Sequence, residues 1–281
     1  MLVDAHCHPF DLAEHIAAEE ERRALGVICA SSAASLEEFE YCERLSAKAK
    51  ADNAAPMLPC FAVHPQMALV LGKHTLCSFQ DSLSALDTFA AQGRLCAVGE
   101  TGFDLYNAAF KETEKIQDEL FAAHLEIALR RDLPLVIHSR RAMHKIFAQA
   151  PALKKCRAVV FHSWPGTMGE GEALIRRGIN VFFSFGAAIT LNHREAMRCC
   201  AAFPADRLLT ETDAPFQPLR SRGFSCYADI MTVLGAMEAL RGAAEMEKII
   251  ETNFRAAFFP PSAPVPSNPN MNEDGSRLLQ N

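Results

Sequence analysis

Two histidines stand one residue apart near the start of the chain, in the segment VDAHCHPF. The imidazoles of His6 and His8 could bind a metal ion or transfer protons. The pair alone decides nothing, because ten histidines in 281 residues give about a third of such a pair by chance. A metal site is indicated only if other ligand residues recur at equivalent places further along the chain.

Such residues do recur, each at the end of a short apolar run. They are His64, Glu100, His138, His162 and Asp213. Imidazole and carboxylate are ligands of divalent ions such as Zn, Mn, Co and Mg. Taken singly, an apolar-flanked histidine such as His138 is more often a core residue, and Glu100 or Asp213 could cap a helix. The repetition at successive runs favours a shared site.

Eight apolar runs supply the elements that would position these residues. The runs are LVDAHCH, LGVICASS, MLPCFAVHP, RLCAVGETG, LPLVIHS, RAVVFHSW, INVFFSFG and RLLTETDAP. Continuous apolar runs are typical of parallel strands buried on both faces. Amphipathic segments such as residues 113–131 lie between them. We therefore predict an α/β fold, a (β/α)8 TIM barrel. An open doubly wound sheet is the alternative, but no G-x-G-x-x-G follows the first run.

In such a barrel the active site lies at the C-terminal ends of the strands. His6 and His8 would point to the same side, since side chains alternate along a strand. Six ligands would then meet at one mouth: His6, His8, Glu100, His138, His162 and Asp213. This number exceeds the need of one tetrahedral ion, so we predict two divalent ions bridged by Glu100 and a water.

Composition limits the function classes. The formal net charge of −6 provides no general attraction for nucleic acid, so any grip on a polyanion must be local or supplied by bound cations. No apolar stretch is long enough to cross a membrane. Ten cysteines without a C-x-x-C motif indicate free thiols in a reducing, cytoplasmic compartment. Cys7 should pack in the core.

The chain divides into two parts. Residues 1–259 form the predicted barrel. Residues 260–281 are rich in Pro, Asn and Ser, and we expect a disordered tail.

The motifs DAHCHPF, AVHPQ, AVGETGFD, LPLVIHSRRA, FHSWPG and ETDAPF together resemble the TatD-type metal-dependent hydrolases, which are related to the amidohydrolases. The resemblance covers residues 1 to about 259 and implies a TIM barrel acting as a metal-dependent deoxyribonuclease, often a 3′→5′ exonuclease on DNA. It implies the same six metal ligands, of Zn, Mg or Mn, with His64 near the substrate phosphate and Arg140 at the pocket rim. Ala62, Gln66 and Trp164 depart from the family pattern, which puts the substrate in question more than the chemistry.

The chemistry expected is phosphodiester hydrolysis by a water that two ions activate. Asp213 would bind an ion and accept the proton, with Glu100 as the bridge. His64 and Arg140 would hold phosphate oxygens, and Trp164 could stack on a terminal base or simply pack in its loop. Glu211 should point away from the site and have a structural role.

Two other functions remain open from the sequence. An amidohydrolase-like enzyme could cleave an amide, ester or lactone with the same water, although no lysine stands at a strand end as a bridging ligand. A non-catalytic binding or scaffold protein could retain the barrel, although it would have no reason to keep six ligands. The remaining histidines are expected at the surface: His15, His74, His124, His144 and His193.

Overall fold

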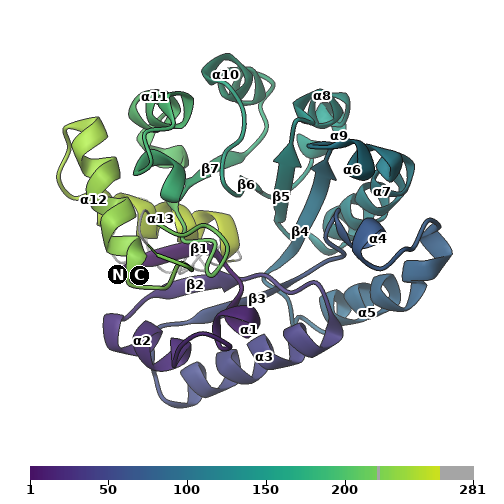
Figure 1. Ribbon diagram of the computed structural model, residues 1–281, viewed down its shortest axis with the longest axis horizontal. Helices are drawn as coiled ribbons and strands as arrows, with labels where there is room; N and C mark the ends of the chain where they lie inside the picture. Colours follow the sequence, from purple (N-terminus) through teal and green to yellow (C-terminus); the bar gives the residue numbers. More distant parts are fainter. Residues whose placement is uncertain (220–221, 260–281) are drawn as a thin grey trace, which may run out of the picture.

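The computed structural model describes residues 1–219 and 222–259, and its centre is one sheet of eight parallel strands (Figure 1). The strands follow one another in chain order around the sheet. They are β1 (Val3–Cys7), β2 (Ile28–Ser31), β3 (Met57–Phe61), β4 (Ala97–Asp104), β5 (Leu135–Arg140), β6 (Val159–Phe161), β7 (Val181–Phe185) and β8 (Leu208–Thr210). Each strand coincides with one of the eight predicted apolar runs, although β4 and β5 extend past the ends of theirs to Asp104 and Arg140. The TIM barrel prediction is confirmed.

Hydrogen bonds join the first and last strands. The Thr210 hydroxyl donates to the Val3 carbonyl at 2.7 Å. Beyond the end of β8, the Asp213 amide donates to the carbonyl of His6 at 2.9 Å, and the His8 amide donates to the carbonyl of Ala214 at 2.8 Å. These bonds bring the segment that carries Asp213 alongside the two N-terminal histidines.

Helices connect the strands and surround the sheet (Figure 1). They are α1 (Pro9–Leu12), α2 (Ala18–Leu25), α3 (Leu36–Ala51), α4 (Met67–Val70), α5 (Gln80–Ala91), α6 (Ala108–Glu112), α7 (Glu114–Arg131), α8 (Met143–Ala148), α9 (Ala150–Leu153), α10 (Met168–Arg176), α11 (Arg194–Ala202), α12 (Asp229–Arg241) and α13 (Met246–Phe258). Short 3-10 turns are η1 (Leu76–Phe79), η2 (Ala187–Ile189) and η3 (Ala205–Arg207). Among the described residues, no helix combines the length and the apolar character that crossing a membrane requires.

Local sequence sets several helix ends. The Ser35 hydroxyl accepts a hydrogen bond from the Glu38 amide and begins α3. Thr167 and Glu170 form a reciprocal capping box at the start of α10. Helix α12 ends at Gly242, which has a φ of 59°, a left-handed conformation that glycine adopts at little cost. These residues therefore fix where α3 and α10 begin and where α12 ends.

The strands are buried on both faces, which explains their continuous apolar sequence. In the pairing of β4 with β5, Gly102 lies opposite His138. Gly102 has a φ of 139°, and a side chain there would overlap the His138 carbonyl. Glycine at this position therefore allows β4, which carries Glu100, to lie directly against the strand that carries His138.

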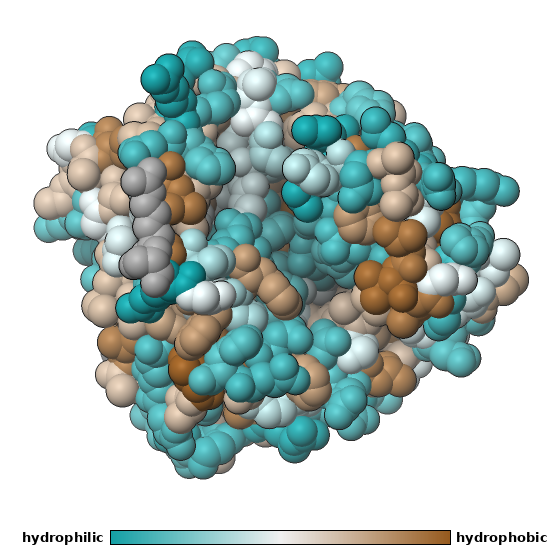
Figure 2. Space-filling view, viewed as in Figure 1, coloured by the Kyte–Doolittle hydropathy of each residue, from teal (hydrophilic) through white to brown (hydrophobic). Residues whose placement is uncertain are grey.

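The predicted tail, residues 260–281, lies outside the described residues. On the face shown in Figure 2, the surface has a deep hollow near its centre, lined largely by hydrophilic residues. A hydrophilic hollow is unusual in a barrel whose interior is filled with apolar side chains, so this hollow is the candidate functional site.

Candidate metal centre

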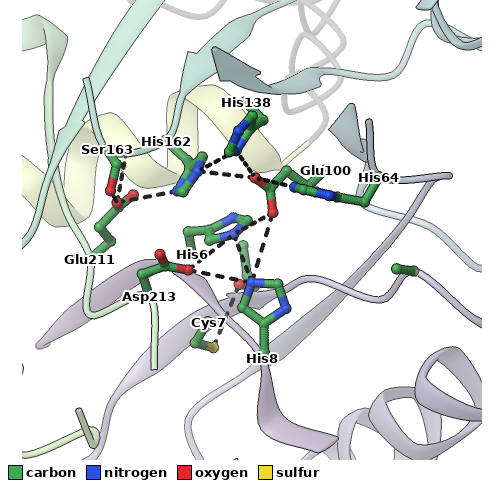
Figure 3. Close-up of polar contacts among 12 residues, drawn as sticks. His6, Cys7, His8, His64, Glu100, His138, His162, Ser163, Glu211 and Asp213 are labelled. Atoms are coloured by element: carbon green, nitrogen blue, oxygen red, sulfur yellow. Dashed lines mark hydrogen bonds and ion pairs between the residues drawn. The ribbon is translucent and has the colours of Figure 1, made fainter. Parts of the chain in front are cut away.

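The six predicted ligands meet in one cluster (Figure 3). His6 and Glu100 stand within β1 and β4, His138 stands within β5, and the other three residues follow the ends of strands. In sequence order the cluster is His6, His8, Glu100, His138, His162 and Asp213. Each is buried or nearly so, with His8 the most open at 14% side-chain exposure. Residues more than two hundred positions apart thus share one small volume.

Glu100 lies at the centre of the cluster, and its two carboxylate oxygens face different groups. The Oε1 atom is 2.7 Å from His138 Nδ1 and 3.0 Å from His162 Nε2. The Oε2 atom is 3.1 Å from His6 Nε2. A carboxylate whose oxygens serve separate ligand groups has the arrangement that a bridge between two cations requires.

The second group is formed by the N-terminal histidines and Asp213. The two Nε2 atoms of His6 and His8 are 3.2 Å apart. Oδ1 of Asp213 lies 3.6 Å from the former and 3.3 Å from the latter. The N-terminal imidazoles therefore reach the aspartate that follows β8.

These separations fit a metal centre. Ligand atoms about 2.1 Å from a tetrahedral ion lie about 3.4 Å from one another. The nitrogens of His138 and His162 are 3.3 Å apart, close to that value. Three groups of ligand atoms can each surround an ion: His6 with His8 and Glu100, His6 with His162 and Asp213, and His64 with Glu100 and His138. Nitrogen and carboxylate donors aimed at shared points suit a divalent cation.

The electrostatics of the cluster favour a cation as well. Burial alone would raise the pKa of Glu100, but the imidazoles of His162, His64 and His6 hold that pKa well below its usual value. Burial also acts against the ionised form of Asp213, yet contact with His8 lowers the pKa of that carboxyl. Two buried carboxylates thus remain charged at neutral pH and are available to bind a cation.

The same carboxylates act on the histidines. Burial opposes protonation of His162, but Glu100 and Glu211 raise the pKa of its imidazole well above the ordinary value. The pKa of His8 is raised in the same way by Asp213, against burial. Since a metal ligand must be unprotonated, any cation held by these nitrogens would compete with protons, and its affinity would fall as pH falls.

A family model described as TatD related DNase matches residues 3–259. This chain belongs to the TatD family.

Comparisons with individual relatives support this family assignment. The chain is 31% identical over 222 residues to an uncharacterized metal-dependent hydrolase, YjjV of Escherichia coli strain K12, a match that covers 77% of this chain and 80% of YjjV. It is 30% identical over 187 residues to the 3′-5′ ssDNA/RNA exonuclease TatD of Pantoea vagans, covering 62% of this chain and 70% of the relative. The crystal structure of YjjV superposes with a TM-score of 0.78 at 26% identity, covering 92% of this chain and 98% of that one.

Asp104 is a component of this TatD centre that the sequence analysis missed. It is fully buried, and its Oδ2 atom lies 3.2 Å from His138 Nε2, the nitrogen that faces away from Glu100. Hydrogen bonds from Gln66 and His138 outweigh burial and lower the pKa of Asp104 to about 2. A carboxylate behind a ligand histidine fixes the tautomer and orientation of the ring. Gln66, which departs from the family pattern, donates to Oδ2 of this same carboxylate at 2.7 Å.

The expected orientation of Glu211 was wrong. Glu211 and Asp213 are two residues apart and so can face the same side of the chain. The Glu211 Oε1 atom accepts hydrogen bonds from the amide and hydroxyl of Ser163, at 2.7 and 2.6 Å. It also lies 3.4 Å from His162 Nδ1, a close charge contact rather than an aligned hydrogen bond. Glu211 therefore supports His162 from behind, and its structural role stands although its direction does not.

A further bond holds Asp213. The Gln217 amide donates to Oδ2 of Asp213 at 2.8 Å and to the Ser163 hydroxyl at 2.6 Å. Both Asp213 and Ser163 have positive φ values, 53° and 42°, a region that non-glycine residues rarely adopt. Such strain persists where the surroundings hold the residue firmly, and it is common at functional sites.

The predicted substrate residues have different outcomes. The Nε2 atom of His64 lies 3.2 Å from Oε1 of Glu100, so this histidine reaches the cluster of candidate ligands itself. Arg140 is at the rim, with a side chain 45% exposed and a nitrogen 3.6 Å from Oδ2 of Asp104. Trp164 is 5% exposed and packs against Phe161, Phe183 and Phe203. The stacking role suggested for Trp164 is therefore wrong in this conformation, and the packing alternative holds.

One histidine expected at the surface is instead in the core. His124 is fully buried on α7, where its ring contacts Thr101 of β4. The helical stripe that contains Ile116 and Leu120 also includes position 124, which is the signal that could have located it. The other four histidines expected at the surface, at positions 15, 74, 144 and 193, are exposed. Cys7 packs in the core as predicted.

Proposed function

We propose that this protein is a metal-dependent phosphodiesterase, a deoxyribonuclease of the 3′→5′ exonuclease type that uses two divalent ions. The observation that carries the proposal is the position of Glu100, whose two oxygens contact separate groups of histidines. The name of the Pantoea vagans relative, a 3′-5′ ssDNA/RNA exonuclease, supports a single-stranded nucleic acid as the substrate and the direction of attack.

In this proposal His6, His8, Asp213 and Glu100 would hold one ion, and His138, His162 and Glu100 would hold the other. The donor set suits Zn²⁺ or Mn²⁺ by its imidazoles and admits Mg²⁺ by its carboxylates. When bound, such ions lower the pKa of a water toward neutrality and neutralise charge on a phosphate.

The side chains of this chain supply the remaining functions. Asp213 accepts the proton of the attacking water, because its carboxylate is ionised and is held in place by Gln217. Arg140 donates hydrogen bonds to a non-bridging phosphate oxygen from the rim, since its guanidinium group is half exposed. His64 contacts the phosphate from the Glu100 side of the cluster.

The net charge of −6 means that the protein as a whole repels a nucleic acid, so binding depends on the ions and the arginine at the mouth. We place the enzyme in the cytoplasm. All ten cysteines are free thiols, which is typical of proteins in a reducing compartment.

The test uses metal-stripped protein, reloaded in turn with Zn²⁺, Mn²⁺ or Mg²⁺ and given single-stranded DNA labelled at its 5′ end. We expect a ladder shortened one nucleotide at a time, abolished by His138→Ala. The matched control is His144→Ala, since that histidine is exposed. The proposal fails if no ion supports cleavage or if His138→Ala retains it. Hydrolysis of N-acyl amino acids without DNA cleavage would instead establish the amidohydrolase alternative.

A further inference from the structure

Exposed aromatic side chains are rare in this protein. The chain has nineteen Phe, three Tyr and one Trp, all within the described residues. Of these, only Tyr106 and Phe216 are exposed, at 46% and 58%. Large aromatic rings gain more than most side chains from burial, so two rings left in solvent need an explanation.

Both rings lie beside the metal centre. Phe216 comes three residues after Asp213, and its amide donates to the Asp213 carbonyl at 2.7 Å. Its ring meets the imidazole of His8 edge to face, with centroids 5.0 Å apart. Tyr106 follows Asp104, the carboxylate that contacts His138, and its amide donates to that carboxylate at 3.0 Å. Within the described residues, the two exposed rings therefore lie at the His8 and the His138 ends of the ligand cluster.

The two rings differ in what covers them. The guanidinium groups of Arg140 and Arg141 lie over the Tyr106 ring, 4.1 and 4.7 Å from its centroid. The Phe216 ring has one such neighbour among the described aromatic and cationic groups, the His8 imidazole. One side of the mouth is thus cationic and suited to phosphate. The other side presents an uncharged aromatic surface that suits a flat, apolar group.

We propose that Phe216 is the base-binding platform of this site: the terminal nucleobase stacks on its ring while the adjoining phosphate lies between the metal cluster and Arg140. The proposal rests on the phosphodiesterase function above and assigns to Phe216 the stacking role that the buried Trp164 cannot fill. Base–aromatic stacking tolerates any base, because every base has a π-face. The platform therefore selects for a base at the chain end without selecting its sequence.

The test measures binding, so that it does not depend on catalysis. Metal-loaded protein is titrated calorimetrically with thymidine 5′-monophosphate and with deoxyribose 5-phosphate, which lacks the base. We expect the nucleotide to bind roughly 5- to 150-fold more tightly, the ratio that corresponds to one stacked base. Phe216→Leu, which keeps an apolar side chain but no ring, should remove that preference, and Phe216→Trp should retain it. Met231→Ala, a change at another exposed apolar residue on α12, should leave the preference unchanged.

The platform is refuted if wild-type protein binds the two ligands equally, or if Phe216→Leu keeps the preference. It is also refuted if Phe216→Leu weakens the binding of both ligands by the same factor, because that result would mean that Phe216 only packs against His8 and does not contact the base. A base preference lost in Phe216→Leu would uphold the platform even if DNA is not cleaved. DNA cleavage with an unchanged preference would refute the platform and leave the proposed function standing.

Discussion

Replacing Asp104 with asparagine tests whether the carboxylate behind His138 prepares the metal centre. The carboxylate accepts four contacts from donors. Its Oδ2 faces Gln66 at 2.7 Å and His138 at 3.2 Å, and Arg140 approaches the same oxygen at 3.6 Å. Its Oδ1 accepts from the Tyr106 amide at 3.0 Å. All four of these polar neighbours of the carboxylate are donors.

Asparagine cannot satisfy this environment in either orientation. If its amide nitrogen takes the Oδ1 position, two N–H groups face each other at Tyr106. If the nitrogen takes the Oδ2 position, it faces the donors of Gln66 and His138. An unsatisfied buried donor costs about 1–3 kcal/mol. The free energy of unfolding of Asp104→Asn should fall by that amount in metal-free protein.

The loss of charge has a second effect. Without the carboxylate, the His138 imidazole loses the acceptor that keeps its Nε2 protonated and its Nδ1 directed at Glu100. Substitution of a residue that hydrogen-bonds a metal ligand lowers metal affinity by about 10- to 100-fold, or about 1.4–2.8 kcal/mol. The assay is competition for Zn²⁺ with a chromophoric chelator at pH 7, beside urea unfolding in EDTA. Asp118→Asn is the control, because that carboxylate is 45% exposed and pairs with Lys145.

Unchanged Zn²⁺ affinity in Asp104→Asn, with the expected loss of stability, would show that His138 is oriented without Asp104. Unchanged stability would show that the carboxylate does not have the hydrogen bonds described here. Either result refutes the reasoning for that half of the prediction. Equal losses in Asp118→Asn would mean that both effects come from net charge rather than from position.

Three further perturbations test other parts of the structure. The His124 Nε2 atom accepts from the Val63 amide and its Nδ1 faces the Thr101 hydroxyl, and burial lowers the pKa of His124 to about 3. As pH falls below about 6.5 the unfolded chain binds a proton that the folded chain does not, so between pH 7 and pH 5 the free energy of unfolding should fall by about 2 kcal/mol more in wild type than in His124→Gln. Urea unfolding in EDTA measures this difference, and parallel pH profiles of the two proteins would contradict it. Gly102→Ala should destabilise the fold by more than about 2 kcal/mol, since its new methyl group would overlap the His138 carbonyl. Gly235→Ala is the control, and because there is open space around that glycine, this variant should melt at a slightly higher temperature than wild type. Equal melting temperatures for the two variants would refute the close β4–β5 approach. Gln217→Ala should lower kcat for DNA about 10- to 100-fold with little change in melting temperature, because Asp213 loses its hydrogen bond from Gln217. The control Gln80→Ala, on an exposed helix face, should keep full activity. A wild-type kcat in Gln217→Ala would show that this hydrogen bond does not matter for catalysis.

The barrel was predictable because its information is local. Eight apolar runs match the eight strands, since a strand buried on both faces needs apolar residues on each side wherever the chain folds. The six candidate ligands were predictable for a related reason. Parallel strands all point their C-terminal ends to one edge of the barrel, so polar residues at those ends, such as His6 and His138, meet without further information.

Errors arose where the position of a side chain depends on packing. The apolar run that contains Glu100 was read as ending at Gly102, whereas β4 continues to Asp104, and the alternation of side chains would have placed positions 100 and 104 on one side. Trp164 was offered as a residue that could stack on a terminal base, but Phe161 at the end of β6 packs against its ring together with Phe183 and Phe203 from later segments. No local sequence pattern predicts that the Trp164 ring is buried.

The order of polar and apolar residues along the chain therefore determined the architecture, the edge of the barrel at which chemistry occurs and the types of ligand found there. The tertiary structure alone decided which oxygen of Glu100 faces which histidines, which carboxylate lies behind His138 and which two aromatic rings remain in solvent. The physical reason is the range of the forces involved. Strand periodicity is set by neighbours one or two residues away, whereas the direction of a side chain at a strand end is set by atoms from other strands and loops, whose contacts form only in the folded chain.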